Sequence, residues 1–172
     1  MRVIAGEFGG RKLVAPEGNT TRPTTDKVRQ AVFNSLNSMG VLEGAVVADL
    51  YAGSGALGIE ALSRGAERCI FVERDRNALH ALRDNIATLQ LDKRATVYAT
   101  DVIAWVPAMR GVDIAFVDPP YQFDQWHELL GKIDAGMVVA ESDDAVEAHP
   151  GWEVLRSRRY GRTWVTLLER LA

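Results

Sequence analysis

Residues 49–60 read DLYAGSGALGIE and place three glycines, Gly53, Gly55 and Gly58, in the spacing G-x-G-x-x-G. The apolar run VVADLYA leads into this loop, and the helical pattern ALGIEALSRGA follows it. A glycine loop between a strand and a helix is typical of an adenosine cofactor site, because glycines let the backbone approach the ligand closely. The glycines alone do not choose between a nicotinamide dinucleotide and another adenosine cofactor.

The order strand, loop, helix repeats along the chain after Val46. Apolar runs typical of strands recur in RCIFVER, ATVYAT, VDIAFVD and GMVVAES, and helical patterns such as RNALHALRDNIATLQL lie between them. Strands that alternate with helices predict an α/β fold, with a parallel sheet and helices on both faces. The C-terminal stretch WEVLRSRRYGRTWVTLLER instead predicts two strands joined at Tyr160 and Gly161, an antiparallel hairpin at the sheet edge.

The first 40 residues do not follow this order. RVIAGEFGGRKLVAP predicts a short β-hairpin, and NTTRPTTDKVRQAVFNSLNSM predicts a loop and then a helix with Thr24 or Thr25 as its N-cap. Apolar residues at helical spacing should face the core: Val28, Val32, Phe33 and Leu36. We therefore divide the chain into an N-terminal extension, residues 1–40, and a main domain, residues 41–172.

The composition is that of a globular protein, with 47% hydrophobic and 25% charged residues in a chain of 172. No apolar run approaches the roughly 18 residues needed to cross a bilayer, and the N-terminus lacks the apolar segment of a secretory signal. Cys69 is the only cysteine, so an internal disulfide is excluded. His80, His127 and His149 do not have metal-ligand spacing, and we expect no metal. These features predict a cytoplasmic monomer.

The charges are unevenly distributed. The net charge is −3, but residues 1–36 and residues 151–172 each carry +3, which leaves −9 for the centre. Basic ends can be ordinary solvated surface, or they can form the contact surface for a polyanion. On charge alone the first interpretation is favoured.

Three acidic residues follow or end successive predicted strands: Asp49, Glu73 and Asp101. Glu73 comes 20 residues after Gly53, a suitable distance for a carboxylate that binds ribose hydroxyls. Asp49 would repel the pyrophosphate of a dinucleotide and attract the cationic ammonium and sulfonium groups of S-adenosylmethionine. Asp101 could bind the amino group of adenine, with the Val102 backbone beside it. The alternative role for Asp49 is a structural cap or turn residue, but the three carboxylates together favour S-adenosylmethionine.

The second motif is FVDPPYQF, at the end of the fourth predicted strand. Its two prolines could simply form a rigid turn. However, an acid before them and an aromatic ring after them suit methylation of an exocyclic amine on a base. Asp118 and the Pro119 carbonyl would accept hydrogen bonds from the two N–H groups of the amine, which frees the nitrogen lone pair for attack. Tyr121 would stack on the base after it has left its stacked position in the nucleic acid.

The sequence resembles the RsmD family of bacterial 16S ribosomal RNA guanine-N2 methyltransferases. The resemblance rests on RVIAGEFGGRKL, TRPTTDKVRQAVFNSL, DLYAGSGALGIEALSRGA, FVERD, VDPPY and RRYGRTWVTLLE, almost from end to end. It implies a Rossmann-like methyltransferase fold, with a seven-stranded, mostly parallel sheet whose last strand is antiparallel. It also implies methyl transfer from S-adenosylmethionine to N2 of one guanine, conventional position 966, in 16S rRNA of an assembling small subunit.

The resemblance suggests specific site residues. The expected catalytic residues are Asp118, Pro119, Pro120 and Tyr121. Those expected at the cofactor are Asp49, Tyr51, Ala52, Gly53, Ser54, Gly55, Glu73, Arg74, Asp101, Val102 and Asp118. With an RNA substrate, the basic ends become candidates for phosphate contacts. We expect Arg11, Lys12, Arg22 and Arg29 to bind phosphates in an RNA-binding extension, residues 1–40, and Arg158, Arg159 and Arg162 to form a second set on the C-terminal hairpin.

Three other functions use some of the same features. A DNA adenine-N6 methyltransferase would share the catalytic motif, although this chain has no room for a separate target-recognition domain. An NAD-dependent oxidoreductase would share the glycine loop, although a second substrate domain is lacking and Asp49 disfavours pyrophosphate. A non-catalytic RNA-binding module would need only the basic ends.

Overall fold

The computed structural model describes residues 1–17 and 25–172 of the chain. Its elements in chain order are α1 (Asp26–Met39), β1 (Val46–Leu50), α2 (Ala56–Ser63), β2 (Arg68–Glu73), α3 (Arg76–Thr88), β3 (Ala95–Ala99), α4 (Val102–Trp105), the 3-10 helix η1 (Val106–Ala108), β4 (Val112–Val117), α5 (Trp126–Lys132), β5 (Ala135–Ser142), β6 (Trp152–Tyr160) and β7 (Thr163–Arg170). In these described parts, no helix has the length and hydrophobicity needed to span a bilayer.

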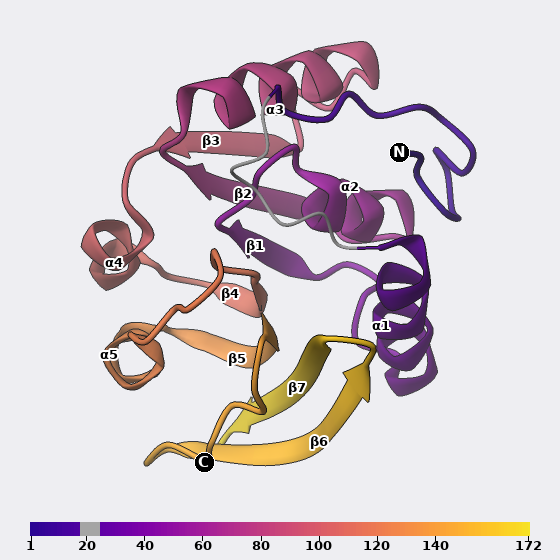
Figure 1. The fold of residues 1–172 in the computed structure, drawn as a ribbon. Helices are drawn as coiled ribbons and strands as arrows, with labels where there is room; N and C mark the ends of the chain where they lie inside the picture. The colour runs from indigo at the N-terminus through magenta and orange to yellow at the C-terminus, as the bar shows by residue number, and fades with distance from the viewer. Residues whose placement is uncertain (18–24) are drawn as a thin grey trace.

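The strands form one seven-stranded sheet in the order β3-β2-β1-β4-β5-β7-β6. Strands β1 to β5 are parallel, whereas β7 pairs antiparallel with both β5 and β6. The predicted parallel sheet with an antiparallel C-terminal hairpin at its edge is therefore confirmed. Figure 1 shows how far the sheet twists between β3 and β6.

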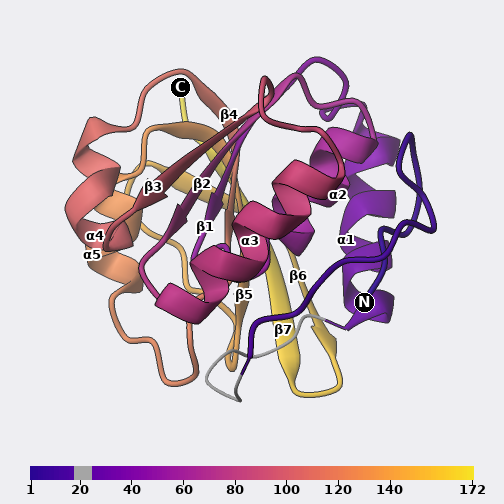
Figure 2. The ribbon, with the colours of Figure 1, turned by 90° about the horizontal axis from the view of Figure 1, so that it is seen from above.

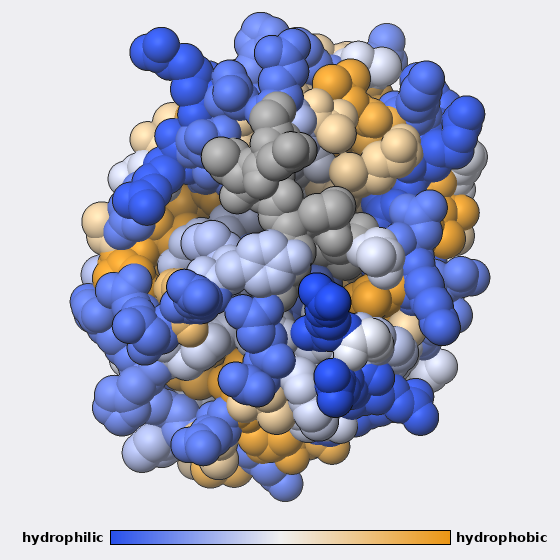
Figure 3. Space-filling view, viewed as in Figure 1, coloured by the Kyte–Doolittle hydropathy of each residue, from blue (hydrophilic) through white to orange (hydrophobic). Residues whose placement is uncertain are grey.

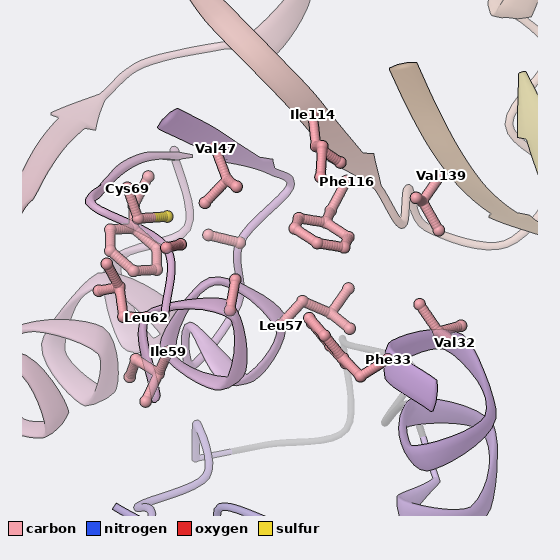
Figure 4. Close-up of a cluster of buried hydrophobic side chains, with 14 of the residues drawn as sticks. Val32, Phe33, Val47, Leu57, Ile59, Leu62, Cys69, Ile114, Phe116 and Val139 are labelled. Atoms are coloured by element: carbon pink, nitrogen blue, oxygen red, sulfur yellow. The ribbon is translucent and has the colours of Figure 1, made fainter. Parts of the chain in front are cut away.

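Helices cover both faces of the sheet, as the alternating pattern predicts. Seen from above, α1, α2 and α3 lie on one side of the strands, and α4 and α5 lie on the other (Figure 2). Figure 4 shows the core under the first group, where the Phe33 ring of α1 lies 5.4 Å from the Phe116 ring of β4. The N-terminal helix thus shares one apolar core with the main domain.

Helix α1 begins and ends at the residues that local chemistry favours. Thr25 is the N-cap, and its side chain accepts a hydrogen bond from Val28 N–H. Gly40, with φ 70°, is the left-handed C-cap. The choice between Thr24 and Thr25 therefore falls on Thr25; Thr24 lies outside the described residues.

The predicted N-terminal hairpin is reduced to one antiparallel bridge, between Arg2 and Lys12. The reason is competition for its backbone N–H groups. The carboxylate of Glu60 in α2 accepts hydrogen bonds from Ile4 N–H and Ala5 N–H, at 2.8 and 3.1 Å. Val3 N–H and Leu13 N–H still donate across the hairpin, to Arg11 O and Met1 O. The next two donors, Ile4 N–H and Ala5 N–H, point to α2 instead, so the ladder does not extend beyond Val3.

The parallel strands β1 to β5 all end at the same edge of the sheet. Ser142, at the end of β5, pairs with Trp164 near the start of β7. The β6–β7 turn therefore reaches this edge too, and Figure 2 shows it at the side toward which β2 and β3 point. We call this the carboxyl edge.

Candidate functional site

The glycine loop joins β1 to α2 at the carboxyl edge. At Gly58, an added Cβ would lie 2.4 Å from the Phe71 ring and 2.6 Å from Cys69 Sγ, so this glycine permits close packing of helix on strand. At Gly53, with φ 59°, an added Cβ would meet no described atom within 4 Å. The loop thus presents an open backbone at its first glycine, which suits a ligand that approaches closely.

Glu73 lies beside this open part of the loop, as its spacing predicts. Its Oε1 accepts a hydrogen bond from Gly53 N–H at 2.8 Å, and its Oε2 accepts from Arg74 N–H and Asp75 N–H at 2.8 Å each. The carboxylate therefore fixes the glycine loop to the end of β2. A carboxylate can accept about four hydrogen bonds, so this arrangement is compatible with binding a ribose hydroxyl.

Asp49 does not have the predicted position. Its side chain is buried, with 1% of the residue exposed, and its Oδ2 accepts a hydrogen bond from Gly58 N–H at 2.9 Å. Burial raises the pKa of this carboxyl well above its ordinary value, and the nearby charges of Asp118 and Glu73 raise it further. The prediction of direct contact with a cationic ligand is wrong: Asp49 holds the first turn of α2, which is the structural alternative.

Replacing Asp49 with Asn should therefore stabilise the protein in a pH-dependent way. The folded pKa of Asp49 lies above its unfolded value of 3.8, so the wild-type protein loses stability as the pH rises from about 3.8 through the folded pKa. Asn keeps an acceptor for Gly58 N–H but does not titrate. The gain in the free energy of unfolding, measured in urea, should grow from pH 4 to pH 7. Asp113→Asn, at an exposed acceptor of Val46 N–H, is the matched control.

Asp101, Arg74 and Tyr51 gather where β3, β2 and β1 end. Asp101 is the N-cap of α4 and accepts from Ala104 N–H, and its Oδ1 lies 3.5 Å from Arg74 Nη1. Burial raises the pKa of the Tyr51 hydroxyl, and the Asp101 charge raises it further, so this hydroxyl stays protonated. Three of the residues predicted at the cofactor are thus neighbours in the structure.

Residues 118–125 join β4 to α5 and carry the predicted catalytic motif; this segment, which we call the catalytic loop, leaves the sheet beside the glycine loop. Leu50, the last residue of β1, pairs with Val117, the last residue of β4. Asp118 and Tyr51 are the next residues on these two strands, which places the two loops side by side. Asp118 is half-buried and Pro119 buried, whereas Tyr121 is 63% exposed.

Aromatic rings fix the two loops to each other and to α5. The Phe123 ring lies 5.5 Å from the Tyr51 ring and 5.1 Å from the Trp126 ring, both in edge-on geometry. The contact between Tyr51 and Phe123 joins residues that are far apart in the sequence. Sequence reasoning gave Phe123 no role, and neither its spacing nor its residue type indicates one.

Asn85 is a second residue that the sequence reasoning missed. It is buried in α3, and its Nδ2 donates to Val14 O and to Ser54 O, at 3.0 Å each. Its Oδ1 accepts from Val14 N–H at 2.8 Å. The amide thus ties the glycine loop to the N-terminal segment. The available signal was a polar residue on the apolar face of α3, between Leu82 and Leu89.

The predicted RNA-binding arginines separate into different groups. Arg158, Arg159 and Arg162 are exposed around the β6–β7 turn at the carboxyl edge. Figure 3 shows strongly hydrophilic side chains over this part of the surface. Arg11 and Lys12 are also exposed, in the N-terminal segment. Arg22 lies outside the described residues.

Arg29 cannot be a phosphate contact. The residue is 0% exposed, and its Nη2 donates to Asp26 Oδ1 and to Arg2 O, at 2.7 Å each. Its Nη1 lies 3.9 Å from Glu60 Oε1. The prediction is wrong because Arg29 lies on the same face of α1 as Phe33 and points into the protein rather than toward solvent.

No metal centre is present in the parts of the chain that the structure describes: no three His, Cys, Asp or Glu side chains there come close enough together to hold an ion.

Comparisons with known proteins match the whole length of this chain. The model of the family described as conserved hypothetical protein 95 matches residues 1–169. The protein YlbH of Bacillus subtilis (strain 168) is 41% identical, with 99% of each chain covered. Ribosomal RNA small subunit methyltransferase D of Escherichia coli (strain K12) is 34% identical, covering 100% of this chain and 91% of that protein. The solved structure of yhhF from Escherichia coli superposes with a TM-score of 0.86, at 34% identity and 100% and 98% coverage.

Proposed function

The chain belongs to the RsmD family, and we propose that it transfers a methyl group from S-adenosylmethionine to N2 of guanine 966 in 16S rRNA. The general activity in this proposal, methylation of ribosomal RNA, is supported by the name of the Escherichia coli relative. The finer part, the base and the atom, rests on the catalytic loop and on the family resemblance of the motifs.

One observation supports this chemistry above the others. The register of β1 and β4 sets Asp118 beside the start of the glycine loop, so a group bound by each loop would meet at the carboxyl edge. A methyl acceptor held by Asp118 and a methyl donor held by residues 53–55, Glu73 and Asp101 would then be neighbours. Positioning of this kind supplies much of the acceleration of a two-substrate reaction.

S-adenosylmethionine, when bound, would supply a methyl group on a cationic sulfur that can leave as a neutral thioether when the guanine nitrogen takes the methyl group. The open backbone at Gly53 and the carboxylates of Glu73 and Asp101 fit such a ligand. Buried Asp49 acts through the loop that it holds.

The roles of the catalytic loop are those of orientation and charge. Asp118 and the carbonyl oxygen of Pro119 accept hydrogen bonds from the two N–H groups of the exocyclic amine. These bonds direct the nitrogen lone pair toward the methyl group. The amine loses one proton, which passes through Asp118 to water. Tyr121, exposed on the same loop, stacks on the flipped base.

The RNA would approach the carboxyl edge. Arg158, Arg159 and Arg162 lie there, and the N-terminal extension, with Arg11 and Lys12, supplies a second basic surface. Helix α1 packs into the core of the main domain, so residues 1–40 do not form a separate structural domain. We propose the division at residue 40 on functional grounds, as the boundary of an RNA-binding extension. The substrate would be 16S rRNA in the small subunit or an assembly intermediate, bound by a monomer.

The other candidate functions receive less support. The NAD-dependent oxidoreductase shares only the glycine loop, and the non-catalytic RNA-binding module leaves the catalytic loop without a role. A DNA adenine-N6 methyltransferase would use the same loop, but the Escherichia coli relative is named for ribosomal RNA.

The decisive experiment is transfer of a tritiated methyl group to small subunits that lack the modification, followed by mapping of the labelled nucleotide. We expect one label per subunit, on N2 of guanine 966. Label on an adenine would contradict the guanine assignment, and the absence of any label on RNA would contradict the proposed activity.

Removing the arginines of the β6–β7 turn should weaken RNA binding without affecting the cofactor. Arg158→Ala and Arg162→Ala, singly and together, should lower affinity for 16S rRNA. They should also reduce the magnitude of the slope of log affinity against log salt concentration by roughly 0.7–0.9 for each phosphate that is no longer neutralised. Filter binding at several salt concentrations measures both. Arg110→Ala is the matched control, because Arg110 is exposed just before β4 begins, at the opposite edge. Equal slopes for all variants would place the contact surface elsewhere.

A further inference from the structure

A cavity of about 430 Å³ lies beside the catalytic loop. Its walls come from Pro119 and Pro120, from the aromatic residues Phe123 and Trp126, and from the segment 142–149 that follows β5. The described residues that line it include none of the glycine loop, so it is distinct from the cofactor site. Its volume lies in the range of about 300–1,000 Å³ that is typical of small-molecule pockets.

Two hydrogen bonds hold the first part of the wall formed by residues 142–149. Ser142 Oγ donates to Asp144 O, and Val146 N–H donates to Thr166 Oγ1 of β7 at 3.3 Å. Between these points, Asp143 Oδ2 accepts a hydrogen bond from Gln122 N–H at 3.1 Å. This bond holds the segment against the catalytic loop, one residue after Tyr121.

The charge of the lining limits what can enter. Asp143, Asp144 and Glu147 line the cavity together with His127 and His149, and no Arg or Lys is among its described lining residues. A phosphate would be repelled there. A flat, uncharged group that donates hydrogen bonds would be favoured, since aromatic rings contribute apolar surface and carboxylates supply acceptors. A nucleobase meets this description, with the phosphates of its chain left at the arginines of the β6–β7 turn.

We infer that this cavity holds the target base and that Asp143 selects guanine, an inference that rests on the proposed function. Guanine carries an N1–H donor next to its 2-amino group, whereas adenine has a lone pair at N1. We place the 2-amino group at Asp118 and Pro119 and turn N1–H toward Asp143, the lining residue that Gln122 N–H links to the catalytic loop. The Asp143 carboxylate accepts this N1–H. It repels a base with a lone pair at N1, which makes Asp143 a specificity-determining residue.

A base analogue separates this role from catalysis. 2,6-Diaminopurine keeps the 2-amino group that is methylated but has a lone pair at N1 and an amino group in place of O6. Small-subunit RNA with either guanine or 2,6-diaminopurine at position 966 gives kcat/KM for each base. The wild-type protein should prefer guanine by about 10- to 100-fold, the effect of losing one hydrogen bond to a charged group. Asp143→Asn should reduce this preference by about 10-fold or more, because the amide can donate to the N1 lone pair.

The matched control is Asp124→Asn, an equal change of charge on an exposed residue of the same loop that does not line the cavity. It should keep the wild-type preference. If Asp143→Asn methylates guanine with an unchanged preference over the analogue, the role of Asp143 is refuted while the proposed function stands. If the wild-type protein methylates neither base, the proposed function fails, and this inference with it. Each variant should keep the circular dichroism spectrum and the S-adenosylmethionine affinity of the wild type, which excludes misfolding as the cause of a changed base preference.

Discussion

Replacing Asp118 with Ala should lower the rate of methyl transfer by at least about 10²-fold, the usual effect of removing one hydrogen-bonding group that acts in the transition state. Asp118 lies at the end of β4, beside the start of the glycine loop. Without its carboxylate, only the Pro119 carbonyl would orient the amine. Single-turnover transfer to small subunits that lack the modification measures the effect directly.

The Asn variant makes this test specific. Asp118→Asn keeps one acceptor oxygen in place, so its rate should fall between those of the wild type and the Ala variant. S-adenosylmethionine affinity, measured by calorimetry, should change little in either variant, because the glycine loop and Glu73 are untouched. Full activity of Asp118→Ala would mean that the carboxylate does not orient the acceptor. A parallel loss of cofactor affinity would instead assign Asp118 to the cofactor site.

The sequence predicted the elements whose signals are local. Apolar runs and helical spacing identified the parallel strands and the helices between them, and the final hairpin was evident from its turn at Tyr160 and Gly161. The spacing of 20 residues between Gly53 and Glu73 corresponds to a hydrogen bond in the structure. These features depend on residues that are close in sequence or on strand ends that a parallel sheet must bring together.

The errors came from the direction in which charged side chains point. Asp49 and Arg29 were both assigned to ligands, and both are buried: Asp49 accepts a hydrogen bond from Gly58 N–H of α2, and Arg29 lies against Glu60 of the same helix. For Arg29 there was a signal, since it precedes Phe33 by four residues and Leu36 by seven, on the apolar face of α1. Glu60 gave a matching signal as a lone acid among the apolar residues of ALGIEAL. Only the fold shows that these two positions meet.

The loss of Glu60 should strongly destabilise the protein. Glu60 is 0% exposed, and besides the two backbone N–H groups of the N-terminal segment it accepts from Arg64 Nε at 2.8 Å. Arg29, also fully buried, has its Nη1 3.9 Å away. Glu60→Ala would leave both arginines without their shared carboxylate and two backbone donors without an acceptor. Breaking a buried pair in this way costs about 3–5 kcal/mol.

Guanidinium denaturation should therefore show a large fall in midpoint for Glu60→Ala. Glu60→Gln should also be destabilised, although less, because its amide presents donors to a site made for an acceptor. Glu7→Ala is the matched control: Glu7 pairs with Arg94 at 3.4 Å but is largely exposed, and such pairs contribute at most about 1 kcal/mol. Because residues 1–14 dock through Glu60 and reach the glycine loop through Asn85, cofactor affinity should fall with stability in the Glu60 variants alone. Wild-type midpoints in those variants would show that the N-terminal segment is held by its apolar contacts, such as those of Val3 and Leu13.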